Sequence, residues 1–320
     1  MADPKFDVTT FGEMMLRLSV PSGQRLETAN NLNTYPAGAE ANVVSLLARL
    51  ERKTSWNGTL PENPLGRLCA NHLRMAGVDL NQILWKTGGR LGTYYVEFAE
   101  PPRGIQVTYD RAYSDITRLE PKEINWSTLL DTRILHLTGI TSPLSPSCHK
   151  IITQALEQAR VKNIPISFDV NYRQKLWSEN EARDVLLPMI QNVEILLCSQ
   201  ADAIRLFGCS GEMDEIAESM LKISHAKHVV ITFGEDGVLL WDGEVWKHEA
   251  ARPTKIVDRL GAGDALAAGV IQGWLEGDIV KGAKYGVTLA ALALSQLGDM
   301  VITTKKELAS LMNASSTITR

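Results

Sequence analysis

A short glycine-rich segment near the C-terminus places a carboxylate where it could act on a phosphate. Gly261, Ala262 and Gly263 precede Asp264 at the predicted start of a helix. Small residues leave the first N–H groups of a helix open, and the helix dipole adds positive potential, so such a helix start binds anions. A carboxylate would weaken a static phosphate site, but it suits a reaction in which a hydroxyl loses its proton beside a phosphate. The segment therefore predicts phosphoryl transfer, with Asp264 as general base and the N–H groups of Gly261–Asp264 as an anion hole.

The segment taken alone leaves two other interpretations open. Asp264 could simply stabilise the helix N-terminus, as acidic residues in a first turn often do. Gly261, Gly263 and Ala267 also loosely match a dinucleotide fingerprint, although that motif normally follows the first strand of a sheet and this segment lies near the end of the chain. The sequence contains no Gly-x-x-x-x-Gly-Lys-Ser/Thr, which excludes a Walker-type phosphate loop.

Strand-like and helix-like segments alternate along most of the chain. This alternation predicts a three-layer α/β/α sandwich with a mostly parallel, doubly wound sheet. The predicted strands are Phe6–Phe11, Thr54–Gly58, Ile134–Thr138, Ile164–Asp169, Ile195–Cys198 and His228–Thr232, with strand pairs around Val229–Trp241 and Val245–His248. The predicted helices are Ala39–Leu50, Leu65–Ala76, Ser147–Val161, Glu181–Gln191, Gln200–Phe207, Asp214–Ile223, Gly263–Leu275 and Val280–Leu297.

Two early stretches, at about 13–36 and 91–113, interrupt this alternation. Each holds two predicted strands with no helix between them: Met15–Val20 with Asn30–Pro36, and Gly92–Glu97 with Ile105–Arg111. They are either ordinary hairpins or one small antiparallel sheet that projects from a single 1–320 domain. Such a sheet would cover the carboxyl edge of the main sheet, where α/β folds bind ligands, and would act as a lid that excludes water.

The composition sets broad limits on the class of protein. A net charge of −4 offers no general attraction to nucleic acid or to an anionic membrane. The N-terminal residues lack the pattern of a signal peptide, and the most apolar stretch, Tyr285–Leu297, is too short to span a bilayer. The four cysteines form no Cys-x-x-Cys pair and read as reduced, buried thiols. We therefore expect a cytoplasmic protein that binds small molecules, with no nucleic acid and no membrane as partner.

Two distant motifs together resemble a known family. The segment Asp258–Asp264 resembles the C-terminal signature Asp-Thr-x-Gly-Ala-Gly-Asp of the ribokinase-like (PfkB) carbohydrate kinases, and Pro36–Asn42 resembles their N-terminal glycine turn. The motifs lie more than 200 residues apart, in the family's order. The resemblance implies a ribokinase-like fold, ATP as phosphoryl donor, Mg²⁺ and a sugar as acceptor. It also implies that Gly38 and Asn42 bind the sugar.

Within the family, the chain most resembles the kinases of 2-keto-3-deoxygluconate. The resemblance rests on Gly38–Asn42, Gly92–Tyr94, Tyr109–Ser114 and Asp169–Trp177. It implies that Tyr94, Tyr109, Arg111 and Arg173 bind the sugar. Arg111 and Arg173 each follow a predicted strand, and converging arginines can hold a carboxylate through paired hydrogen bonds, which favours an acidic sugar. Both arginines could instead be solvated or structural.

The nucleotide and metal residues are implied less directly. Thr232, Gly234 and Gly237 resemble the family's turn around the ATP phosphates and ribose, although a simple hairpin turn would use the same glycines. The family's Mg²⁺-associated Asn-x-x-Glu appears here only as Ser199-Gln-Ala-Asp202, so that Asp202 would act on the metal through water. Arg259 stands where the family often has threonine, and it could add charge beside the phosphates or face solvent.

The resemblance implies phosphorylation of the C6 hydroxyl of 2-keto-3-deoxygluconate, which yields 2-keto-3-deoxy-6-phosphogluconate and ADP. Other acceptors stay open: fructose, ribose, 5-keto-2-deoxygluconate or a nucleoside. A non-catalytic relative that only binds sugar or nucleotide also stays open. The resemblance implies a homodimer or higher homo-oligomer formed through the lid, and it leaves open whether a monovalent cation activates the enzyme.

Overall fold

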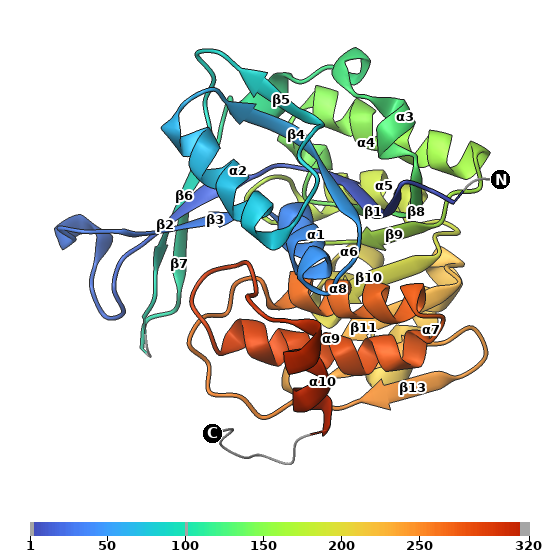
Figure 1. Ribbon diagram of the computed structural model, residues 1–320. Coiled ribbons are helices and arrows are strands. Elements are labelled where there is room, and N and C mark those ends of the chain that lie inside the picture. The colour runs from blue at the N-terminus through green and yellow to red at the C-terminus, as the bar shows by residue number, and fades with distance from the viewer. Residues whose placement is uncertain (1–2, 100–101, 314–320) are drawn as a thin grey trace.

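The computed structural model describes residues 3–99 and 102–313 of the 320-residue chain, and its main feature is a nine-stranded sheet (Figure 1). The strand order is β13-β12-β11-β10-β9-β8-β1-β4-β5. All neighbours from β11 to β5 run parallel, whereas β12 and β13 are added antiparallel at one edge. The strands are β1 (Phe6–Phe11), β4 (Thr54–Pro61), β5 (Ile83–Lys86), β8 (Thr132–Thr138), β9 (Ile166–Asp169), β10 (Ile195–Ser199), β11 (His228–Thr232), β12 (Val238–Trp241) and β13 (Trp246–Glu249).

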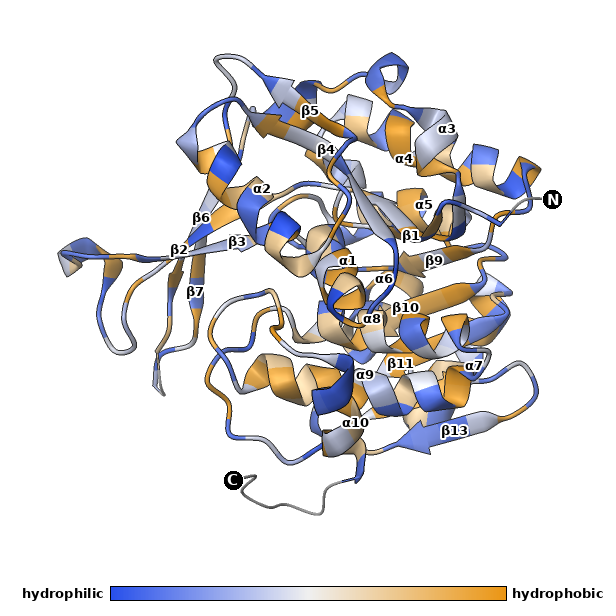
Figure 2. Ribbon diagram, viewed as in Figure 1, coloured by the Kyte–Doolittle hydropathy of each residue, from blue (hydrophilic) through white to orange (hydrophobic). Residues whose placement is uncertain are grey.

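Helices pack on both faces of this sheet, because successive strand residues point to opposite sides. In β10, Ile195 and Leu197 belong to one buried apolar cluster, and Leu196 and Cys198 belong to the other. Figure 2 shows the hydrophobic residues gathered along the central strands. One face carries α1 (Ala39–Arg49), α2 (Pro64–Ala76), α8 (Ala262–Leu275), α9 (Ile279–Leu294) and α10 (Lys305–Asn313). The other carries α3 (Trp126–Leu129), α4 (Pro146–Val161), α5 (Glu179–Met189), α6 (Gln200–Phe207) and α7 (Met213–Ser224).

A second sheet of four strands projects from the main body (Figure 1). Its order is β3-β2-β6-β7, and its strands are β2 (Met15–Ser19), β3 (Asn33–Ala37), β6 (Gly92–Glu97) and β7 (Gln106–Asp110). We call this sheet the lid. The prediction of one sheet is confirmed, but the prediction that it is antiparallel is wrong for one pair: β2 and β6 run parallel. The long chain between these two strands passes through α1, β4, α2 and β5, and such a connection permits parallel pairing.

The predicted α/β sandwich and most of its elements are confirmed. The largest error at a helix end concerns α9, predicted to reach Leu297 but ending at Leu294. The carbonyl of Leu294 accepts backbone N–H groups from Val257 and Asp258, which replace the helical bond, and Leu297 is exposed. Strand β5 and the helices α3 and α10 were not predicted. All four cysteines are buried free thiols, as expected. Within the described residues, no helix has the length and apolar character needed to cross a membrane.

Candidate active site

The predicted anion hole lies at the N-terminus of α8. Gly261 precedes the helix with φ of 83° and accepts the first helical hydrogen bond, from the N–H of Ala265 at 2.9 Å. A Cβ atom on Gly261 would lie 2.3 Å from the carbonyl oxygen of Asp299, so both the dihedral angle and the space require glycine here. Within the part of the chain that the structure describes, no side chain caps this helix. The N–H groups of its first turn therefore remain available to an anion.

The two signature motifs meet at Asp264. The Nδ2 group of Asn42 in α1 donates a hydrogen bond of 2.6 Å to Oδ2 of Asp264. The N–H of Gly38, the residue before α1, donates in turn to Oδ1 of Asn42 at 3.3 Å. A Cβ atom on Gly38 would lie 2.2 Å from the carbonyl oxygen of Glu13, so glycine allows α1 to approach the end of β1. Gly38 and Asn42 thus orient the carboxylate that begins α8.

Asp264 lies among other charged groups at the carboxyl edge of the main sheet. Burial raises its pKa well above the ordinary aspartate value, and the charge of Asp169 at the end of β9 raises it further. The Asn42 hydrogen bond and the positive charge of Arg173 act in the opposite direction. Burial also raises the pKa of Asp169, to about 6. A carboxylate with a raised pKa is a better proton acceptor once it is ionised, which suits a general base.

The lid contributes two tyrosines and an arginine next to this edge. Tyr94 and Tyr109 are cross-strand neighbours whose ring centroids are 5.7 Å apart. The Arg111 guanidinium lies over the Tyr109 ring at 5.5 Å and forms a buried ion pair with Glu13, including a 2.9 Å bond from Nε to Oε2. Arg111 therefore has a protein carboxylate as partner and could bind a ligand only through its remaining donors.

Arg173 lies in the loop that follows β9 and is exposed. Its Nη1 donates to the carbonyl oxygen of Tyr172 at 3.0 Å, and its charge lowers the pKa values of Asp169, Asp202 and Asp264. The same loop contacts the lid, because Nζ of Lys175 donates to the carbonyl oxygen of Val107 in β7. Arg173 is thus an exposed cation whose charge acts on Asp264, in a loop that contacts the lid through Lys175.

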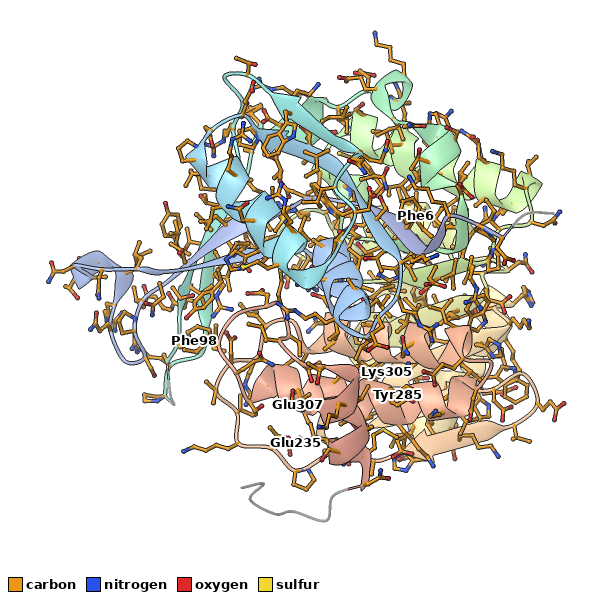
Figure 3. All side chains as sticks on the ribbon, viewed as in Figure 1. Phe6, Phe98, Glu235, Tyr285, Lys305 and Glu307 are labelled. Carbon is orange, nitrogen blue, oxygen red and sulfur yellow. The ribbon has the colours of Figure 1, made fainter. Side chains whose placement is uncertain are left out.

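A cavity of about 650 Å³ lies on the other side of the α8 N-terminus. It brings together Thr232, Gly234 and Gly237 with Ala262 and Gly263. The exposed side chain of Arg259 also lines it, and small and branched apolar residues form one wall: Val287, Ala290, Ala291 and Leu294 of α9. Figure 3 shows Glu235, another lining residue, in the same C-terminal part of the molecule. The cavity has a polar end at the N-terminus of α8 and an apolar wall along α9, which suit the phosphates and the base of a nucleotide.

Carboxylates that could serve Mg²⁺ lie at the same edge. Ser199 is the N-cap of α6, and its Oγ accepts the N–H of Asp202 at 3.0 Å. Burial raises the pKa of Asp202, and the charge of Asp202 contributes to the raised pKa of Asp169. Among the described residues, no three His, Cys, Asp or Glu side chains are grouped to hold a metal by themselves. The residues fit an ion held mainly by phosphate oxygens and water, with Asp169 and Asp202 nearby.

Comparison with known proteins agrees with this geometry. A family described as pfkB family carbohydrate kinase matches residues 5–306. The chain belongs to this family. It is 34% identical over 302 residues to the 2-dehydro-3-deoxygalactonokinase of Haloferax volcanii, which covers 94% of this chain and 95% of the relative. It is 27% identical to the 5-dehydro-2-deoxygluconokinase of Geobacillus thermodenitrificans, over 90% of this chain and 87% of the relative.

A solved structure gives the same result for the fold. The 2-dehydro-3-deoxygluconokinase of Thermotoga maritima superimposes with a TM-score of 0.91 at 33% identity, and the match covers 98% of this chain and 100% of that one. The predicted ribokinase-like fold is therefore confirmed. The chain is a carbohydrate kinase, and the kinases of the pfkB family use ATP.

The structure of this pfkB kinase also reveals polar residues to which the sequence analysis gave no role. Asp169 was noted only as part of a motif, although a carboxylate at the end of a predicted parallel strand is a signal for this edge of the sheet. Glu13 also follows a strand, but its partner Arg111 is 98 residues away, so the sequence alone gives no signal for the pair. Arg17, Asp258 and Asp299, which are also far apart in the sequence, form a buried cluster of ion pairs.

Proposed function

We propose that this pfkB kinase phosphorylates the C6 hydroxyl of 2-keto-3-deoxygluconate, or of a close relative of that sugar acid. One observation carries the proposal: Asp264, at the open N-terminus of α8, faces a site that also contains the exposed cation Arg173 and the lid tyrosines. The catalytic arrangement is a base with adjacent N–H donors. The arginines favour a substrate with a carboxylate, and the names of the relatives include three such acids.

Asp264 accepts the proton of the acceptor hydroxyl while Asn42 holds the carboxylate in place. The hydroxyl oxygen attacks the γ-phosphorus of ATP, the bond to the β-γ bridging oxygen breaks, and ADP leaves. The N–H groups at the start of α8 stabilise the charge on the phosphoryl oxygens. Removal of one such donor typically costs 10²–10³-fold in kcat. The lid keeps water from competing for the phosphoryl group.

ATP occupies the cavity of about 650 Å³, with its phosphates toward Gly263 and its base against the apolar wall of α9. Thr232, Gly234 and Gly237 line the phosphate and ribose region, and Arg259 adds positive charge. When bound, Mg²⁺ would neutralise charge on the ATP phosphates, and Asp202 and Asp169 would hold its water ligands.

The sugar acid lies between Asp264 and the lid. Gly38 and Asn42 contribute polar contacts at the start of α1, and Tyr94 and Tyr109 form the wall opposite the base. Arg173 binds the carboxylate, and Arg111 adds the donors that Glu13 leaves free. Fork-shaped guanidinium–carboxylate pairing would select an acid over a neutral sugar of the same length.

A substrate panel tests this proposal. ADP release is measured with 2-keto-3-deoxygluconate, its galactonate epimer, 5-keto-2-deoxygluconate, fructose, ribose and a nucleoside. We expect the highest kcat/KM with one of the 3-deoxy acids. Asp264→Asn should lower kcat by on the order of a hundredfold or more with that substrate, while ATP binding changes little. Preference for a neutral sugar would reject the acid, and the absence of ADP release with every compound would favour a non-catalytic protein.

The role of Arg173 is tested with Arg173→Ala on the preferred acid and on a neutral ketose of similar length. Loss of the carboxylate contact should raise KM for the acid by roughly tenfold or more, equal to about 1.4 kcal/mol. Arg173 also lowers the pKa of Asp264, so part of the loss will be common to both sugars. The ratio of the two kcat/KM values removes that common part. An unchanged ratio would contradict the carboxylate contact.

A further inference from the structure

A buried ion cluster connects the lid to the anion hole. Arg17 in β2 is fully buried, with a side-chain exposure of 0%. Its Nη2 donates to Oδ2 of Asp258 at 2.6 Å, its Nη1 to Oδ1 of Asp299 at 2.7 Å, and its Nε to Oγ of Ser19 at 2.7 Å. The guanidinium thus uses all three nitrogen atoms. We call Arg17, Asp258 and Asp299 the buried cluster.

The two carboxylates fix the loops that shape the anion hole. Oδ1 of Asp258 accepts the N–H of Leu260 at 3.0 Å, and Oδ2 accepts the N–H of Gly298 at 3.1 Å. Gly261 then packs against the carbonyl oxygen of Asp299 so closely that no larger residue fits. Asp258 and Asp299 therefore set the position of the turn that begins α8.

The other side of the cluster belongs to the lid. Tyr94 in β6 donates its hydroxyl to Oδ2 of Asp299 at 2.7 Å. The rings of Tyr35 and Phe98 lie 5.0 and 4.9 Å from the Arg17 guanidinium carbon. Figure 3 shows Phe98 on the lid, on the side toward the C-terminal loops. The cation is therefore shielded from water by lid side chains and neutralised by carboxylates of the catalytic loops.

A buried ion pair is weak evidence for stability, because desolvation offsets much of its attraction, but it can enforce one arrangement of the segments that it joins. Here those segments are the lid strands, next to the sugar, and the turn that binds the transferred phosphate. We propose that Arg17 is a positioning residue for phosphoryl transfer, which holds the anion hole at Gly261–Asp264 in register with Tyr94 through Asp258 and Asp299.

The proposal has a thermodynamic consequence. A sugar that orders the lid through Tyr94 also orders the anion hole, so sugar and nucleotide bind with positive coupling. By linkage, each ligand raises the affinity of the other by the same factor, typically about 5–150-fold. Loss of Arg17 should bring this factor close to one while each site remains intact. The inference rests on the sugar kinase function proposed above, but not on which sugar is preferred.

The kinetic experiment compares Arg17→Ala and Arg17→Lys with Arg52→Ala. Arg52 also pairs with a carboxylate, Glu276, but on the other end of α8. We expect Arg17→Ala to lower kcat by on the order of a hundredfold, the cost of a lost anion-hole donor. At saturating sugar, KM for ATP should also rise by the lost coupling factor, about 5–150-fold. Guanidinium chloride at millimolar concentration should restore at least part of kcat, and sodium chloride should not. Arg17→Lys should be intermediate, because an ammonium cannot bridge both carboxylates in the same way, and Arg52→Ala should match the wild type.

A second measurement does not require turnover. Hydrogen–deuterium exchange should be faster at Leu260, Ala265 and Gly298 in Arg17→Ala, because their N–H groups are bonded to Asp258 and Gly261 of the turn. It should be unchanged there in Arg52→Ala, which does not release the turn. Calorimetry with a non-hydrolysable ATP analogue, with and without the sugar, gives the coupling factor. If Arg17→Ala does not fold, Asp299→Asn preserves the shape of the cluster and weakens one of its charged hydrogen bonds. We then expect kcat to fall by about tenfold and exchange at the turn to become faster, without rescue by guanidinium because Arg17 is still present.

The outcomes separate this inference from the proposed function. A folded Arg17→Ala or Asp299→Asn protein with kcat within about twofold of wild type and unchanged exchange would overturn the positioning role. An effect on KM alone, or no rescue by guanidinium in a folded Arg17→Ala protein, would also overturn it. Wild-type protein without activity on any sugar would reject the proposed function instead, and the exchange measurement would still decide whether Arg17 holds the turn.

Discussion

At Asp264, the burial that makes the carboxylate a good base also favours its protonated form. Burial and the charge of Asp169 raise its pKa, whereas Asn42 and Arg173 lower it. The balance decides at which pH the base is available. With Asp264 as the proposed base the active form is the carboxylate, so we expect activity to be lost as the pH falls through the raised pKa.

The pH dependence of kcat/KM therefore has a predicted sign for each neighbour. Asp169→Asn removes a negative charge, so the acid limb should move to lower pH; Arg173→Ala removes a positive charge, so it should move to higher pH. In the wild type the limb should lie above the ordinary aspartate value of about 3.9. The measurement is kcat/KM from about pH 5 to 9 with one sugar for all three proteins. Shifts in the same direction, or no shift, would contradict Asp264 as the titrating base.

The residues that could be predicted from sequence are those that lie in compact motifs. Asp264, Gly261 and Gly263 lie within four positions of the chain at the start of α8, and the physics of a helix N-terminus suggests the role proposed for them. The partners of Arg17 lie 241 and 282 residues away, and no local pattern marks a strand arginine as buried. Arginine is normally exposed, so composition and periodicity point in the wrong direction.

At the scale of elements, helix α8 depends on the turn before it. Gly261 has φ of 83° and no room for a side chain, whereas a Cβ atom on Gly263 would have no neighbour within 4 Å. The two glycines of the motif are therefore required for different reasons. Gly261 is required by the protein's own structure. Gly263 lines the cavity of about 650 Å³, where a side chain would narrow the space proposed for the phosphate.

Alanine substitutions should separate these roles. Gly261→Ala should destabilise the protein by about 2 kcal/mol or more, since a non-glycine residue at positive φ is strained and its Cβ would overlap the Asp299 carbonyl. Differential scanning calorimetry should show a lower Tm by several degrees. Gly263→Ala serves as the matched control and should leave Tm unchanged within about one degree. Equal Tm values for both variants would contradict this assignment of the two glycines.

Most helices and strands could be predicted because their apolar periodicity is strong and local. Strands β1 and β11 and helix α6 have the predicted bounds. The parallel pairing of β2 with β6 could not be predicted, because the register of two strands so distant in sequence depends on the path of the chain between them. The end of α9 was missed for the same reason, since Val257 and Asp258 provide its last partners.

At the scale of the whole molecule, the outer side of the lid is covered by the main core at Leu16 and only half-buried at Thr93, Tyr95 and Glu97. Residues of β6 alternate between buried and half-buried, so Tyr94 and Val96 face the body while Thr93, Tyr95 and Glu97 lie on the outer side. Among the residues that the structure describes, strands β3 and β7 each pair with a single neighbouring strand. Unpaired strand edges beside a half-exposed aromatic are a natural place for a second copy to bind.

We therefore expect a homodimer that forms through the lid. Sedimentation equilibrium should give about twice the chain mass of 35.3 kDa. Tyr95→Glu places a charge on the outer lid face and should weaken the dimer by roughly tenfold or more, because the same change occurs in both copies of a symmetric interface. Val161→Glu, on an exposed position of α4 away from the lid, is the matched control and should not change the mass. A wild-type protein that sediments as a single chain at every concentration would contradict the dimer. Equal dissociation by both variants would contradict an interface at the lid.

If the dimer forms as expected, then the lid proposed to cover the sugar also joins the subunits, and the affinity for the sugar acid should depend on protein concentration.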